Sequence, residues 1–309
     1  MFTSLFRKST PLNYSIVILG VVLFYFLVQI HFVTNVFTSI NAIEKIVLLA
    51  IIFGSIFTTN FIVKKNGLSK DSAYTVFFYF LLLLFFPNVW NNSSLLISNF
   101  FILLSLRRLV SLQSLKTPKE KIFDASLWVF VAAMFHFWCI IYIFLVFIAI
   151  LFHAARDYRN WFLPFIAFFT SCSVFVLFAL IFDKSWISQL LSDTTVNYKI
   201  DYFVKPSQNL ALSVYATIGL YFVLSLLMSM SNRPLMLHTS YKKVLWAFFL
   251  GIAVFIVSTN KSNDLLVFTV APLAVMITSY IEMAQIKWQK EVIIAFLIIS
   301  GFIAFFYQL

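Results

Sequence analysis

Long apolar stretches separated by short polar segments run along the whole chain. The apolar runs cover roughly 14–33, 43–63, 74–90, 95–112, 122–153, 161–182, 210–230, 244–258, 266–283 and 292–307. A helix needs about 20 residues to cross the hydrocarbon core, and fewer when its flanking residues snorkel. The pattern therefore predicts an all-α polytopic transmembrane helical bundle, with 1–309 forming a single integral-membrane domain.

The run 122–153 does not fit a single crossing. A continuous helix over these residues would be about 48 Å long, too long for about 30 Å of hydrocarbon. It is also short for two full spans. We expect a short helical hairpin that turns at 134–138, which gives the chain about 11 spans.

The distribution of basic residues supports this hairpin. With eleven spans, 17 of the 22 Lys and Arg residues lie on the side of the N-terminus, whereas a single crossing at 122–153 reduces this number to 14. Lys and Arg are enriched in cytoplasmic loops. The charges therefore predict a cytoplasmic N-terminus and a C-terminus on the outer side.

Composition excludes a water-soluble protein. Apolar residues make up 62% of the chain and charged residues 11%, against about 25% charged in a soluble domain. The net charge of +11 is explained by the basic inner loops, so we expect no nucleic-acid partner. With 40 Phe and only 6 Gly, large aromatic side chains must fill the gaps between helices.

Several kinds of chemistry are also excluded. The chain has four histidines: His31, His136, His153 and His238. In the predicted topology the first two face outward and the last two inward, so they cannot share one metal ion. Cys139 and Cys172 have no C-x-x-C partner, and phosphate-binding, zinc-protease and serine-hydrolase motifs are missing. We therefore expect no metal site and no cofactor.

The longest extramembrane segment is 183–209, on the outer side. Ser185 can cap a short amphipathic helix, and a strand-like alternation of apolar residues follows it. An eight-residue strand is not stable alone in water. It either lies against the membrane beside the helix, pairs with the sheet edge of another protein, or is disordered. The candidate partner-binding residues are Trp186, Val196, Tyr198, Ile200 and Tyr202.

The strongest basic cluster lies at the inner ends of the predicted spans. It consists of Arg107, Arg108, Lys116, Lys119 and Lys121. Such a cluster can bind anionic lipid head groups, although topology alone also explains it. Asp124 follows Lys121 by three residues, so we expect these two side chains to form an ion pair.

A few polar residues on the outer side are the candidates for catalysis. If the protein is an enzyme, Glu44 is the base and Lys261 neutralises a phosphate leaving group, with His136 and Asp264 nearby. Otherwise the charged residues form solvated interface pairs and His136 is a hydrogen-bonded turn residue. No acidic residue lies near the middle of a span, which argues against an ion-coupled transporter.

Three segments, 1–6, 98–108 and 121–126, resemble an uncharacterised family of multi-span inner-membrane proteins from Bacteroidota. Some members are labelled beta-carotene monooxygenase, but the divided histidines argue against that label. The resemblance implies a Gram-negative envelope, so the chain would lie in the bacterial inner membrane with its C-terminus in the periplasm. It implies no established activity.

A weaker resemblance is to multi-span lipid-carrier-dependent glycosyltransferases. The segment 258–264 leading to Ala271, Pro272 and Leu273 is similar to the late-span pattern of those enzymes. That class carries an Asp in its first outer loop, whereas the loop 34–42 has no acidic residue here and Glu44 is the only substitute.

We expect a non-catalytic subunit of a larger cell-envelope complex for secretion, motility or envelope biogenesis. Its partners would be other envelope proteins and membrane lipids. The alternative is a glycosyltransferase or carrier for a lipid-linked sugar, and a transporter is third. A core filled with aromatic side chains favours the subunit, whereas a deep outward-facing polar cavity favours the enzyme.

Overall fold

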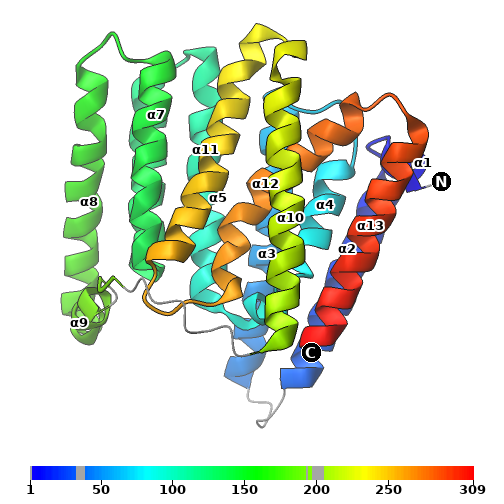
Figure 1. The fold of residues 1–309 in the computed structure, drawn as a ribbon. Helices are drawn as coiled ribbons and strands as arrows, with labels where there is room; N and C mark the ends of the chain where they lie inside the picture. The colour runs from blue at the N-terminus through cyan, green and yellow to red at the C-terminus, as the bar shows by residue number, and fades with distance from the viewer. Residues whose placement is uncertain (1, 33–38, 193, 197–204) are drawn as a thin grey trace. The chain divides into compact units, whose positions relative to one another are not determined.

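The computed structural model describes residues 2–32, 39–192, 194–196 and 205–309 (Figure 1). Within these residues every regular element is a helix and no strand is present. The chain divides into two compact units. Unit 1 comprises Met1–Leu96, Asp201–Arg233 and Val270–Leu309, and unit 2 comprises Ile97–Ile200 and Pro234–Thr269.

Unit 1 is built around a helix that has no exposed face. Its elements are α1 (Phe2–Phe6), α2 (Pro11–Phe32), α3 (Ser39–Lys65), α4 (Tyr74–Leu83), η1 (Pro87–Asn91), α10 (Pro206–Ser229), η4 (Met230–Asn232), most of α12 (Val267–Met283) and α13 (Lys287–Gln308). All ten residues of α4 are buried, and α2, α3 and α13 pack against it. This explains why α4 can be apolar all round.

The chain leaves α4 inside the unit, where unpaired backbone groups would be costly. The amides of Leu84, Phe85 and Phe86 each donate to the carbonyl three residues earlier. The indole of Trp90, which is fully buried, donates to Leu83 O at 3.3 Å. The non-helical segment is thus satisfied within the protein.

Unit 2 contains the run 122–153 as two helices. Its elements are most of α5 (Ser93–Ser111), η2 (Leu112–Ser114), α6 (Pro118–Phe135), the 3₁₀ helix η3 (Phe137–Tyr142), α7 (Ile143–His153), α8 (Arg159–Ile181), α9 (Ser185–Ser192), α11 (Leu235–Val257) and η5 (Asn263–Leu266). The turn falls at His136, whose backbone is extended. Lys119 Nζ lies 3.2 Å from Asp157 Oδ2, so the start of α6 meets the end of α7 and the two helices are antiparallel.

The helix α8 packs on α6 through small residues. Its buried positions include Pro164, Ala167, Ser171 and Ala179, which allow the two helices to approach closely. Much of the remaining surface of α8 is exposed and apolar. Such a surface is suited to lipid contact.

Eight helices of the described chain are long and apolar enough to cross a membrane. They are α2, α3, α5, α8, α10, α11, α12 and α13. The apolar helices Tyr74–Leu83 and Phe137–His153 are shorter. The chain is therefore a multi-pass, all-helical membrane protein, while the number of about 11 spans stays a prediction.

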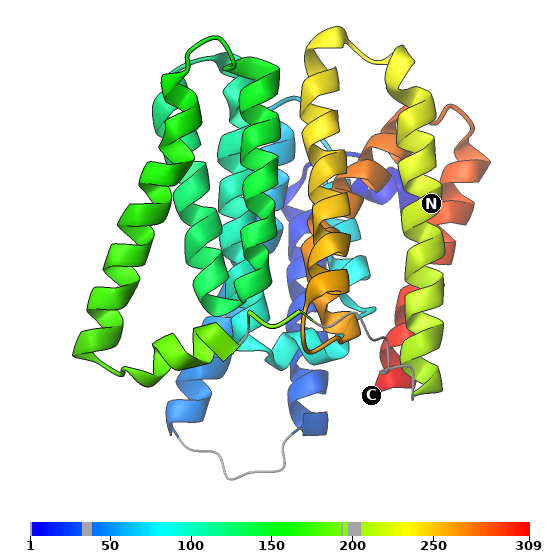
Figure 2. The same ribbon diagram turned by 60° about the vertical axis from the view of Figure 1, so that its left-hand side comes forward.

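The segment 183–209 contains α9, which crosses one end of unit 2 (Figure 2). Its N-terminus is capped by Asp183 and not by Ser185, because the Asp183 carboxylate accepts the Ser185 backbone N–H at 2.9 Å. A carboxylate is favoured there by the helix dipole, and its hydrogen bonds from Ser185 lower the pKa of Asp183. Trp186 and Val196 are exposed. The rest of the expected strand, including Tyr198, Ile200 and Tyr202, lies outside the described residues.

Candidate functional site

The N-terminal helix α1 is fixed to one end of unit 1. Asn13 Nδ2 donates to Leu5 O and Lys8 O, both at 2.6 Å, which closes the turn between α1 and α2. The Phe6 ring stacks on Phe77 with 4.2 Å between centroids, and the backbone N–H of Ala73 donates to Phe6 O at 3.0 Å. The residue after Phe6, Arg7, is therefore held at this end of the unit.

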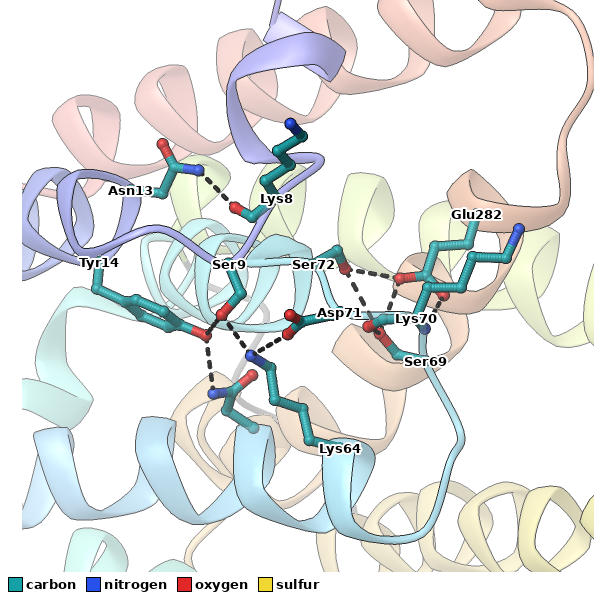
Figure 3. Close-up of polar contacts among 11 residues, drawn as sticks. Lys8, Ser9, Asn13, Tyr14, Lys64, Ser69, Lys70, Asp71, Ser72 and Glu282 are labelled. Carbon is teal, nitrogen blue, oxygen red and sulfur yellow. Dashed lines mark hydrogen bonds and ion pairs between the residues drawn. The ribbon is translucent and has the colours of Figure 1, made fainter.

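Lys64, in the last turn of α3, joins α3 to the start of α2 (Figure 3). Its ammonium group lies 2.9 Å from Asp71 Oδ1 and also donates to Ser9 Oγ. Ser9 Oγ lies 2.9 Å from the Tyr14 hydroxyl. The hydrogen bond and the charge of Lys64 lower the pKa of Asp71. Because Asp71 is mostly exposed, solvent screens this ion pair.

Glu282, in the last turn of α12, holds the loop that precedes α4 (Figure 3). Its carboxylate accepts hydrogen bonds from Ser69 Oγ at 2.7 Å, Ser72 Oγ at 2.6 Å and the backbone N–H of Lys70 at 2.9 Å. The loop begins with Gly67, whose φ of +65° suits glycine. Glu282 therefore has a structural role as a triple acceptor.

A cavity of ≈ 730 Å³ lies beside these contacts, between α1, the loop before α4, and the junction of α12 and α13. Its charged lining residues are Arg7, Lys70, Lys287, Lys290, Glu282 and Glu291. Among the described residues, no ion pair involves any of the four cations. The arrangement is suited to binding an anion.

No metal site accompanies this cavity, since no group of three or more His, Cys, Asp or Glu among the described residues can hold a metal ion. Sequence reasoning missed the cavity, because its cations come from three segments that are far apart in the chain. The sequence shows that each segment is basic, but it does not show that the three segments meet at one cavity.

A basic end of unit 2 is organised differently. Lys243 is fully buried and donates to the carbonyls of Leu109 at 2.7 Å and Val110 at 3.3 Å, near the C-terminus of α5. His153 Nε2 lies 3.2 Å from the same ammonium group. Lys121 donates to Ser111 O at 2.8 Å. The two lysines thus satisfy carbonyls that a helix leaves unpaired at its end.

The predicted lipid-binding cluster is largely engaged in such contacts. Arg108 lies 2.8 Å from Asp124 Oδ2, and Lys119 pairs with Asp157. The prediction that Asp124 pairs with Lys121 is therefore wrong. Asp124 pairs with Arg108, whereas Lys121 binds the end of α5. Lys116 is exposed and Arg107 is half-buried. Arg108, Lys119 and Lys121 are thus held by contacts within unit 2.

The candidate catalytic residues are divided between the units. Glu44 is exposed on α3 of unit 1, whereas the other three belong to unit 2. His136 stacks on Phe268 with 6.0 Å between ring centroids, and Lys261 Nζ donates to Ser258 O at 3.3 Å. Asp264 lies in η5. These contacts are typical of packing and turn residues.

The fold and these sites define an all-helical, multi-pass membrane protein with a basic cavity at one end of unit 1. The chain belongs to the family of unknown function DUF6427, whose model matches residues 1–309. No curated protein and no solved structure matches the chain. The expectation that it belongs to an uncharacterised family is thus confirmed.

Proposed function

We propose that the chain is a non-catalytic subunit of a larger cell-envelope complex in the inner membrane of a Bacteroidota bacterium. The observation that carries this proposal is the filled core of each unit. In unit 1, Trp90, Tyr79 and Phe78 are fully buried, and in unit 2 Tyr142 and Phe268 are. A core packed with aromatic side chains suits a scaffold that presents surfaces to partners.

The hydrogen bonds of the buried polar groups support the same function. Tyr142 donates to Ala247 O at 3.0 Å and to Phe268 O at 3.3 Å, which ties η3 to neighbouring helices. Lys243 is engaged with helix carbonyls. These groups are used to hold helices together, as expected of a structural protein.

The proposed topology has eleven crossings, with α4, α6 and α7 added to the eight long helices. A 3₁₀ helix rises about 2.0 Å per residue, so η3 and α7 together extend about 28 Å, close to the hydrocarbon thickness. In unit 1 the contact between Lys64 and Ser9 places the end of α3 beside the start of α2, at the cytoplasmic side of this topology. The C-terminus then lies in the periplasm.

Reporter fusions test this topology. We expect cytoplasmic signals from fusions at Ser114 and Asn160 and a periplasmic signal at Ser207. A periplasmic signal at Asn160 would show that α6 and α7 do not form two crossings and would invert the second half of the chain.

Affinity purification from native membranes tests the subunit function. We expect envelope proteins to be recovered with the tagged chain in near-constant ratio. The segment 196–203 is the proposed contact, so Lys199→Pro should weaken recovery while Lys199→Ala does not, because proline removes a backbone donor. Equal recovery from both variants, at equal abundance, would refute strand pairing.

A second comparison separates a scaffold from an enzyme. A scaffold should retain full function in vivo when Glu44 is replaced by Gln, since no proton transfer depends on it. Loss of function in Glu44→Gln at normal abundance and normal partner recovery would favour the glycosyltransferase alternative.

A further inference from the structure

The cavity of unit 1 gathers four positive charges from three separate segments. Arg7 follows α1, Lys70 lies in the loop before α4, and Lys287 and Lys290 lie in the first turn of α13. The opposing charge is already used in part, because the Glu282 carboxylate accepts three hydrogen bonds from the protein. The lining therefore has an excess of available positive charge.

This positive charge is placed where the protein itself does not favour it. The charges of Lys70 and Arg7 repel Lys290, while the carboxylate of Glu282 attracts it. The first turn of α13 contains no acidic residue, and the N-terminal end of a helix disfavours cations. The preference for basic cytoplasmic loops accounts for lysines at this end, but not for their convergence on one cavity. An anion in the cavity would offset both costs.

The cavity also lies at the depth of lipid head groups. The candidate span that contains α12 ends at Met283, and the next begins at Lys287. Trp288 lines the cavity and is 73% exposed, as is typical of a tryptophan at the membrane interface. Further along α13, Val292 and Phe296 are exposed and apolar. A molecule with its anionic group in the cavity can thus lay an apolar chain along α13.

We propose that this cavity binds the phosphate group of an anionic membrane lipid, with Arg7, Lys287 and Lys290 as the charge partners. Its volume of ≈ 730 Å³ is in the range of small-molecule sites. A free phosphate compound carries the same charged group, but the exposed apolar face of α13 favours a lipid. The site goes beyond the proposed scaffold function and does not depend on it.

Thermal unfolding of the purified full-length chain in dodecyl maltoside tests this site. The chain is titrated with phosphatidylglycerol, with phosphatidylcholine, and with sodium phosphate against sodium chloride at equal ionic strength. The test variant is Lys287→Gln with Lys290→Gln. The control is Arg156→Gln with Lys242→Gln, which removes two exposed charges from unit 2. Size-exclusion chromatography checks that both variants are folded.

We expect phosphatidylglycerol, and not phosphatidylcholine, to raise the unfolding midpoint of the native chain and of the control. The test variant should need about thirtyfold more phosphatidylglycerol for half the effect, since each lysine contributes about 1 kcal/mol to anionic lipid binding. A matching response to sodium phosphate would keep the phosphate site but overturn the lipid as its ligand. No response to either, or an equal loss in the control, would overturn the site.

Discussion

The basic ends of the two units use the same residue types in opposite ways. In unit 2, Lys243 and Lys121 bind helix carbonyls, and Arg108 and Lys119 bind carboxylates. In unit 1 the four cations of the cavity form no ion pair among the described residues. Basic residues near the ends of apolar helices can thus supply either internal cross-links or a binding surface. The partners of each cation, and not its position in the sequence, decide which.

The largest effect is expected from breaking the cross-link at Lys243. Replacement by Met keeps the side-chain volume but removes the donor to Leu109 O and Val110 O. We expect a loss of about 2 kcal/mol in the free energy of unfolding, because buried carbonyls are left unpaired. Thermal unfolding in detergent measures it. Its exposed neighbour provides the control, and a Lys242→Met variant as destabilised as Lys243→Met would contradict the assignment.

Glu282 in unit 1, like the cations of unit 2, uses its charge to hold segments of the protein together. Glu282→Gln removes a charge that accepts three hydrogen bonds and places an amide N–H against a donor. We expect a destabilisation of about 1 kcal/mol, measured by the same unfolding assay. Glu120→Gln, at an exposed carboxylate of α6, is the control and should change the free energy of unfolding by only a few tenths of a kcal/mol. Similar values for both would show that the loop before α4 does not depend on Glu282.

A smaller effect is expected from the pH dependence of the ion pair between Lys119 and Asp157. The pKa of Asp157 is lowered by the backbone N–H of Arg159 and then by Lys119. Because the folded pKa is below the ordinary value of 3.8, this contribution is complete above that value and is lost as the pH falls through the folded pKa. As the pH is lowered below 4, the unfolding midpoint of Asp157→Asn should therefore decrease slightly less than that of the native chain. Identical slopes would show that the pair is fully screened.

The smallest effect on stability is expected at the cavity lysines of unit 1, which form no ion pair among the described residues. Without anionic lipid, Lys287→Gln with Lys290→Gln should leave stability unchanged or raise it slightly, since two like charges near a helix N-terminus are removed. Unfolding in a neutral detergent measures this. A clear loss of stability would mean that these lysines are internal cross-links like Lys243, and the contrast between the units would disappear.

Much of the fold could be predicted because it depends on local pattern. Apolar runs gave the eight long helices, and the turn of the α6–α7 hairpin falls within 134–138. The role of Lys243 could not be predicted, since in the sequence it is one of several lysines between two apolar runs. Its contacts with α5 and α7 exist only in the folded chain. The cavity was missed for the same reason. Glu282 and Lys70 are 212 residues apart, and a single sequence does not show which distant segments meet.

Complete burial of α4 constrains how the protein is made. This helix is enclosed partly by α13, which begins only at Lys287, whereas α4 ends at Leu83. At about 5–20 residues per second, a ribosome needs roughly 10–40 s to synthesise the intervening chain. During that interval one side of α4 has to face lipid or an insertion factor, and the backbone after it has to keep its turn hydrogen bonds without the finished enclosure. Assembly of unit 1 is therefore completed only after α13 has been synthesised.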